Sequence, residues 1–123
     1  MKVTEFEVPI YGVQVTLIEI EGPKDAKEIT PYLKWADASP SSVEDCLNAI
    51  KNNCMNGGDT WRNLLQRQIV CVIYKCESLK KKYEIIGHEK RHIEDRILQF
   101  FNVDDIESAG LLAGFLTTKM FNF

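Results

Sequence analysis

One segment of this chain, Ile69-Val70-Cys71-Val72-Ile73-Tyr74, is continuously apolar and rich in β-branched residues. A run of this length and composition is typical of a β-strand that is buried on both faces. The chain has 123 residues, which suits a single domain with one hydrophobic core. We therefore expect one domain over residues 1–123 that contains a buried strand at this position.

The N-terminal segment predicts a second strand region. Apolar residues alternate with polar ones from Val3 to Ile20, with a break at Tyr11-Gly12 and an end at Gly22-Pro23. This pattern predicts a β-hairpin over residues 2–21. Pro9 indicates that the first strand is an edge strand or carries a bulge near its end.

Two helices are predicted between this hairpin and residue 54. Residues 25–34 fit a short helix that Pro31 interrupts. Ser41 or Ser42 can cap a further helix that continues through Asn53, because the apolar residues that follow recur at helical spacing.

The rest of the chain alternates turns with longer helical patterns. Residues 56–59 predict a turn, and residues 61–68 fit a short helix or a strand. A long helix is expected from Ser78 to about Phe101, and a last helix from about Asp105 to Met120, with a break at 102–104.

The overall composition argues against two classes of protein. The net charge of -3 does not fit a non-specific nucleic-acid binder, which needs a strongly basic face. No window approaches the roughly 20 apolar residues of a membrane span, and the charged N-terminus lacks the apolar region of a secretory signal. We therefore expect a cytoplasmic protein with reduced cysteines, of which Cys71 is buried in its strand.

Both histidines of the chain lie in one segment, His88-Glu89-Lys90-Arg91-His92, inside the predicted long helix. Positions i and i+4 of a helix share a face, so two imidazoles can hold one metal ion. The glutamate between them is placed to hold or deprotonate a metal-bound water. On a helical wheel the histidines lie opposite the apolar stripe of Ile86, Ile93 and Ile97, which favours a functional pair beside a cleft. The alternative is a solvent-facing polar side without a function.

A catalytic zinc site needs a third protein ligand, and the chain has no third histidine. Our first candidate is Glu107, because it lies in the first turn of the last helix, which a short turn can fold back against the long one. Glu107 could equally complete a capping box behind an N-cap aspartate. Reserve ligands are Asp95, Asp104 and Asp105, and Asp95 could instead orient a histidine.

The last helix combines small and large apolar residues. Glycine inside a helix costs about 1 kcal/mol, so its small residues predict a close approach to the long helix. These small residues are Ala109, Gly110, Ala113 and Gly114. The residues expected to cover the core are Leu111, Leu112, Phe115, Leu116 and Met120.

Residues 87–98 and 105–116 together resemble small zincin-like proteins of phages and mobile elements. Those proteins carry an H-E-x-x-H helix followed by a D-x-E-x-x-A/G-x-L-x-G-x-L helix, and the resemblance covers roughly the C-terminal half. It implies an α+β fold, a small zincin-like domain in which a short, mostly antiparallel sheet packs on the long motif helix and a C-terminal helix. It also implies that His88, His92 and Glu107 bind zinc and that Glu89 is the general base.

The resulting hypothesis is a zinc-dependent hydrolase of the metallopeptidase type, with Zn²⁺ as its cofactor and a peptide or protein as its substrate. An extended substrate would lie along an edge strand, either of the N-terminal hairpin or of residues 69–74. Tyr74, Tyr83 and Arg96 are candidates for stabilising the oxyanion.

Two other classes of protein remain open. One is a non-catalytic binding protein that keeps a zincin-like scaffold, and the other is a helical-hairpin interaction module. The residues between the two histidines are usually uncharged in zincin peptidases, whereas this chain has Lys90 and Arg91 there. This departure weakens the prediction of peptidase activity and leaves the fold prediction unchanged.

Overall fold

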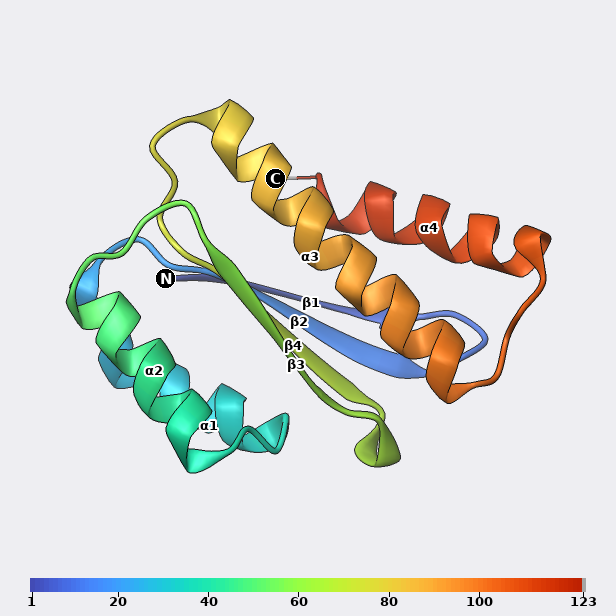
Figure 1. Cartoon of the computed structure of the whole chain (residues 1–123), viewed down its shortest axis with the longest axis horizontal. Helices are drawn as coiled ribbons and strands as arrows, with labels where there is room; N and C mark the ends of the chain where they lie inside the picture. Colours follow the sequence, from blue (N-terminus) through green and yellow to red (C-terminus); the bar gives the residue numbers. More distant parts are fainter. Residues whose placement is uncertain (123) are drawn as a thin grey trace.

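The computed structural model describes residues 1–122, which form a four-stranded sheet with helices on both faces (Figure 1). The strands are β1 (Lys2–Val8), β2 (Val13–Glu19), β3 (Gly58–Asn63) and β4 (Gln68–Ile73). Their order across the sheet is β1-β2-β4-β3. The pairs β1/β2 and β3/β4 are antiparallel, and the central pair β2/β4 is parallel. The fold is therefore α+β with a mostly antiparallel sheet, as predicted.

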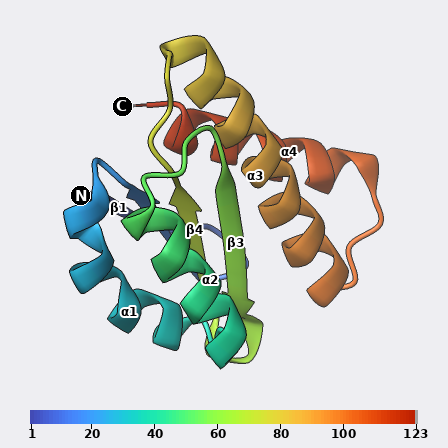
Figure 2. The ribbon, with the colours of Figure 1, turned by 60° about the vertical axis from the view of Figure 1, so that its left-hand side comes forward.

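The helices form a layer on each side of this sheet. They are α1 (Ala26–Trp35), α2 (Pro40–Lys51), α3 (Leu79–Phe100) and α4 (Ile106–Met120), with short 3₁₀ turns η1 (Pro23–Asp25) and η2 (Leu64–Gln66). Helices α1 and α2 cover one face, and α3 and α4 cover the other (Figures 1 and 2). Figure 2 shows α3 lying beside β3, with α4 on the far side of α3.

Strand β4 is buried on both faces, which confirms the prediction for the apolar run. Ile69, Cys71 and Ile73 pack against the α3/α4 layer, and Val70 and Val72 pack against the α1/α2 layer. The same strand pairs with β2 along one side and with β3 along the other. The prediction that it could offer a free edge to a substrate is therefore wrong; the edge strands are β1 and β3.

The N-terminal hairpin is confirmed, with β1 at the edge as Pro9 indicated. Strand β3 occupies Gly58–Asn63, where we predicted the end of a turn and a segment of undecided type. Its sequence has few strand-forming residues, and its extended conformation comes from pairing with β4. Helix α1 runs through Pro31 without a break, contrary to the predicted interruption.

The caps of the helices explain where each one begins. Ser78 caps α3 through the amide of Lys81, as predicted. Helix α2 begins earlier than expected because Ser39 is its N-cap and Pro40 takes the first helical position, which suits a residue without an amide hydrogen. Asp105 caps α4 by accepting a hydrogen bond of 2.8 Å from the Ser108 amide.

Helix α4 is held by one stripe of large residues. Leu112, Leu116 and Met120 are buried, as predicted, whereas Leu111 is 70% exposed. A Cβ atom added at Gly110 or Gly114 would meet no atom within 4 Å, apart from the helix's own backbone and chain neighbours. The predicted close approach of α3 at these glycines is therefore wrong, because they face away from the helix packing.

Candidate metal site

The rotation of α3 about its axis decides where the motif residues point. Ile86, Ile93 and Ile97 are fully buried against the sheet, as the helical wheel predicted. This anchoring leaves His88 and His92 on an exposed side of the helix, off the apolar stripe. Glu89, between them in sequence, is only 3% exposed and packs against β3.

The three motif side chains form one cluster. The Nε2 atoms of His88 and His92 lie 3.0 Å apart, with the imidazole rings nearly perpendicular. One ligand atom from each histidine and one carboxylate oxygen of Glu89 all lie within 4.8 Å of one another. These three residues could therefore hold a metal ion.

The approach of Glu89 to β3 depends on a glycine. A Cβ atom at Gly58 would lie 3.0 Å from Cγ of Glu89, 3.0 Å from the carbonyl oxygen of Val72 and 3.1 Å from Cγ2 of Ile85. Any side chain at position 58 would therefore take the space that Glu89 occupies. The sequence analysis assigned Gly58 to a turn and missed this role.

Two buried polar atoms at this place lack a hydrogen-bond partner among the described residues. They are Oε2 of Glu89 and Oγ1 of Thr60, which lies on β3. A buried polar atom without a partner costs roughly 1–3 kcal/mol, so native structures seldom contain one without a reason. Thr60 lies close enough to Glu89 for its hydroxyl to lower the pKa of the carboxyl, so the two atoms face each other across a contact that falls short of a hydrogen bond.

Burial raises the pKa of Glu89 above its ordinary value of 4.5, because the charged form loses its contact with water. The nearby His92 and His88 act in the opposite direction, and the charge of Asp59 adds to the increase. A carboxylate with a raised pKa is a stronger base than an exposed one. The surroundings of Glu89 therefore favour the uptake of a proton.

The cluster opens into a cavity of about 270 Å³ between α3 and β3. Arg62 and Asp59 line it from the strand, and Arg96 lines it from the helix one turn beyond His92. Arg96 was predicted as an oxyanion partner and does line this cavity. Arg62 was not predicted, because its position beside the helix follows only from the pairing of β3 with β4.

Glu107, the predicted third ligand, lies outside this cluster. It is exposed in the first turn of α4, one residue before the position that closes a capping box on Asp105, so it does not take that role either. Helix α4 packs toward β1, where Phe115 contacts Phe6. The histidines line the cavity between α3 and β3. Glu107 and the two histidines are thus on opposite sides of α3.

The reserve ligands and the two tyrosines predicted to stabilise the oxyanion also lie outside the cluster. Asp105 is the N-cap of α4, and neither tyrosine lines the cavity. Asp95 and Asp104 are exposed and outside the cluster. Tyr74 donates a hydrogen bond of 2.8 Å to Asp59 and packs with the α1/α2 layer, and Tyr83 stacks on Phe121.

The two charged residues between the histidines stay clear of the site. Lys90 forms an ion pair with Glu94 one turn further along α3. Arg91 is exposed, and it does not line the cavity.

Family models, curated proteins and solved structures gave no match to this chain. Within residues 1–122, no helix combines the length and apolar character needed to cross a membrane.

Proposed function

We propose that this protein is a zinc-dependent hydrolase of the metallopeptidase type, in which His88 and His92 hold the metal and Glu89 is the general base. The observation that carries the proposal is the buried Glu89 carboxylate, which has an unpartnered oxygen beside two imidazoles whose Nε2 atoms are 3.0 Å apart. The resemblance of the motif segment to small zincin-like proteins supports the same assignment.

The donor set fits zinc. Two nitrogens bound to one tetrahedral zinc at 2.0–2.1 Å are about 3.3 Å apart, close to the separation of the two imidazoles. A bound zinc ion supplies Lewis acidity, which makes water nucleophilic near neutral pH. Glu107 is not part of the proposed ligand set, because α4 carries it away from the histidines.

Glu89, two arginines and the edge of β3 have separate roles in the proposed reaction. Glu89 accepts a proton on its free oxygen as water attacks a carbonyl carbon, and its raised pKa suits this role. Arg96 and Arg62 line the same cavity and place positive charge where an oxyanion develops. The outer edge of β3 offers backbone groups to an extended peptide substrate.

One observation favours a second candidate, a non-catalytic binding protein that keeps a zincin-like scaffold. Catalytic zinc sites usually have three protein ligands in addition to the base. Among residues 1–122 the cluster contains two histidines and one carboxylate. If Glu89 serves as the third ligand, the site holds a metal but has no base.

The first experiment measures metal content. Protein purified without a metal-chelating tag is analysed for zinc by mass spectrometry, and the His88→Ala variant is compared with it. We expect one zinc per chain in the wild type and its loss in the variant. Asp95→Asn, which changes an exposed carboxylate on the same helix, should retain the metal. Absence of stoichiometric zinc in the wild type contradicts the proposal.

The second experiment separates the base from a ligand. Glu89→Gln should retain zinc and lower the hydrolysis of fluorogenic peptides by about 10²–10⁴-fold, the usual contribution of a general base. Loss of zinc in this variant means that Glu89 is a ligand, which favours the binding protein. A zinc-loaded wild type without hydrolytic activity leads to the same conclusion.

A further inference from the structure

Four side chains follow one another along α3 at intervals of four residues, which is close to one turn of a helix. They are His88, His92, Arg96 and Phe100. The first three line the cavity of the metal cluster, and Phe100 lines a second cavity of about 460 Å³. The row therefore leads from the proposed metal ligands past a guanidinium to an aromatic ring.

Strand β3, which lies beside α3, has one free edge. The amide of Tyr74 donates a hydrogen bond of 2.8 Å to the carbonyl oxygen of Gly57, so these opposite residues form a hydrogen-bonded pair. Such pairs alternate along an antiparallel ladder. The backbone groups of the residues between them, Gly58, Thr60 and Arg62, therefore point toward the free edge, where an extended peptide can pair with them.

The two cavities adjoin each other along this edge, because Thr60 and Arg62 line both of them. The first contains the metal cluster. The second is lined by Phe100, which is 44% exposed, and by Leu65, which is 86% exposed. An extended peptide on β3 therefore passes the metal cluster first and an apolar surface after it.

Two guanidinium groups line the first cavity, that of Arg62 from β3 and that of Arg96 from α3. Among residues 1–122, neither forms an ion pair with a carboxylate. Asp59 lines the same cavity, but its carboxylate accepts a hydrogen bond of 2.8 Å from the Tyr74 hydroxyl. The oxyanion of one carbonyl group carries one negative charge, so two guanidinium groups leave positive charge for a second anionic group.

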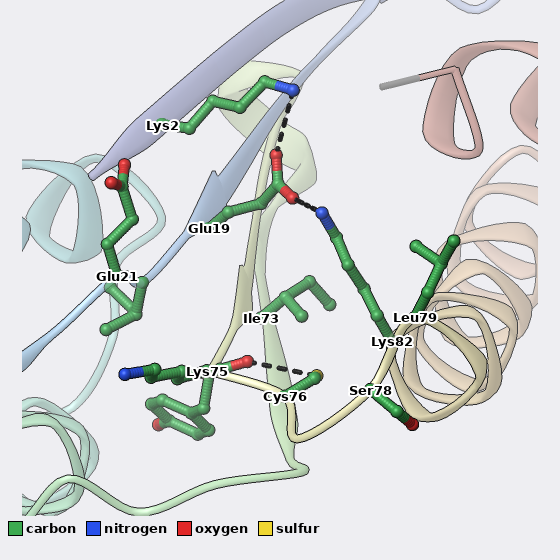
Figure 3. Close-up of a pocket in the computed structure, with 11 residues that line it drawn as sticks. Lys2, Glu19, Glu21, Ile73, Lys75, Cys76, Ser78, Leu79 and Lys82 are labelled. Carbon is green, nitrogen blue, oxygen red and sulfur yellow. Dashed lines mark hydrogen bonds and ion pairs between the residues drawn. The ribbon is translucent and has the colours of Figure 1, made fainter.

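A cavity of about 640 Å³ at the carboxyl ends of β2 and β4 shows the opposite arrangement. There the carboxylate of Glu19 contacts the amino groups of both Lys2 and Lys82 (Figure 3). The chain itself thus supplies the counter-charge in that cavity. In the cavity between α3 and β3, the described residues supply none to Arg62 or Arg96, so the anion that suits them has to come from a ligand.

We propose that the substrate is an extended peptide that pairs with the free edge of β3 and carries an acidic side chain, which Arg62 and Arg96 bind. A planar guanidinium group matches a carboxylate through two parallel hydrogen bonds. An apolar side chain further along the peptide packs against Leu65 and Phe100. Because the groove continues past the arginines to these two residues, the carboxylate belongs to a side chain and not to the end of the peptide. The proposal rests on the proposed hydrolase, whose substrate class it names.

Binding is measured first, on metal-free protein, by following backbone amide shifts by NMR. The probe is acetyl-Leu-Ala-Glu-Ala-Leu amide, whose blocked ends carry no charge. Its sequence is the same in both directions, so it presents a leucine on the same face as the glutamate whichever way it runs along β3. Two further peptides have glutamine or lysine in place of the glutamate. A fourth has glutamine and a free carboxyl terminus.

We expect saturable shifts at Gly58, Thr60 and Arg62, with the glutamate peptide bound about tenfold more tightly than the blocked glutamine peptide and the lysine peptide bound most weakly. Arg96→Gln should reduce the preference for glutamate over glutamine to less than about threefold. Arg91→Gln is the matched control and should keep the preference, because it makes the same change at an exposed arginine of α3 that does not line the cavity. If Arg96→Gln perturbs the fold, Arg62→Gln, at an exposed position of β3, takes its place.

The zinc-loaded wild type is then assayed for cleavage of the same peptides, which separates this proposal from the proposed function. Equal binding of the two blocked peptides with glutamate and glutamine overturns the acidic specificity even if both are cleaved. So does an equal preference in the Arg96→Gln and Arg91→Gln variants, or tighter binding of the peptide with the free carboxyl terminus. Binding with the expected preference but without cleavage supports recognition of acidic peptides and contradicts the hydrolase. A kcat/KM that is highest for the glutamate peptide supports both.

Discussion

Glu19 and Glu89 are both buried glutamates, but their surroundings differ. Glu19, at the end of β2, is 8% exposed and lies between the amino groups of two lysines. Glu89, in the middle of α3, is 3% exposed, and its Oε2 atom has no hydrogen-bond partner among the described residues.

We therefore expect the buried charge of Glu19 to stabilise the fold and the buried charge of Glu89 to destabilise it. A buried carboxylate that is paired recovers much of the free energy lost on leaving water, whereas an unpaired one does not. Residues that cost stability in this way concentrate at functional sites. Glu89 lies beside the two histidines, so its cost is consistent with the proposed metal site.

The largest effect is expected from filling the space that Glu89 occupies. Gly58→Val places side-chain atoms against the backbone of Val72 and against Glu89, so we expect the free energy of unfolding to fall by about 3 kcal/mol. Denaturant unfolding measures this change. Gly110→Ala is the control, since its Cβ meets open space in a helix, and it should stabilise the protein by about 0.5–1 kcal/mol. An unchanged midpoint for Gly58→Val contradicts the close approach.

The next effect concerns the paired glutamate. Glu19→Gln removes the charge that contacts Lys2 and Lys82, and we expect a loss of about 2 kcal/mol in the free energy of unfolding. The estimate lies below the range for fully buried pairs because half of the Lys2 side chain is exposed. Glu44→Gln, at an exposed position of α2, should change stability by less than about 0.5 kcal/mol. Similar midpoints for the two variants would mean that the pairing around Glu19 contributes little.

The same substitution at Glu89 should have the opposite sign. In protein freed of metal by a chelator, Glu89→Gln removes a buried charge without losing a hydrogen bond at Oε2. We expect the variant to be about 1 kcal/mol more stable than the wild type, because burying an uncharged amide costs less free energy than burying a carboxylate. Thermal and denaturant unfolding measure the difference. A destabilised variant would show that the Glu89 carboxylate is satisfied in solution.

The smallest effect is the dependence of this difference on pH. Burial raises the pKa of Glu89 above 4.5, so the folded state keeps its proton to a higher pH than the unfolded state does. The wild type therefore loses stability relative to Glu89→Gln as the pH rises from about 4.5 through the folded-state pKa. Unfolding curves of both metal-free proteins across this range provide the measurement. A difference that shrinks with rising pH contradicts the direction of the pKa shift.

The parts of the fold that local sequence determines were predicted well. The β-branched run of β4 and the alternation in β1 and β2 match the strands of the sheet. Ser78 begins α3 and Asp105 begins α4, because a short polar side chain before a helical pattern can accept hydrogen bonds from the first amides.

The parts that depend on distant contacts could not be predicted in this way. Strand β3 is extended because β4 pairs with it, and the role of Gly58 appears only once α3 lies across that strand. The spacing of the motif placed His88 and His92 on one face but did not indicate that Glu89 is buried. Glu107 followed the histidines closely in sequence, yet packing on β1 directs α4 to the other side of α3.

The parallel pairing of β2 with β4 also has a consequence for synthesis of the chain. Gln14 pairs with Gln68 and Glu19 with Ile73, so β2 has no neighbour on its inner side until α1, α2 and β3 have been made. During that interval an apolar strand exposes unpaired backbone groups, which is the condition under which growing chains associate. Contacts so distant in sequence also slow folding. The middle of the sheet is thus unpaired on one side early in synthesis, although its two strands are the most buried part of the finished sheet.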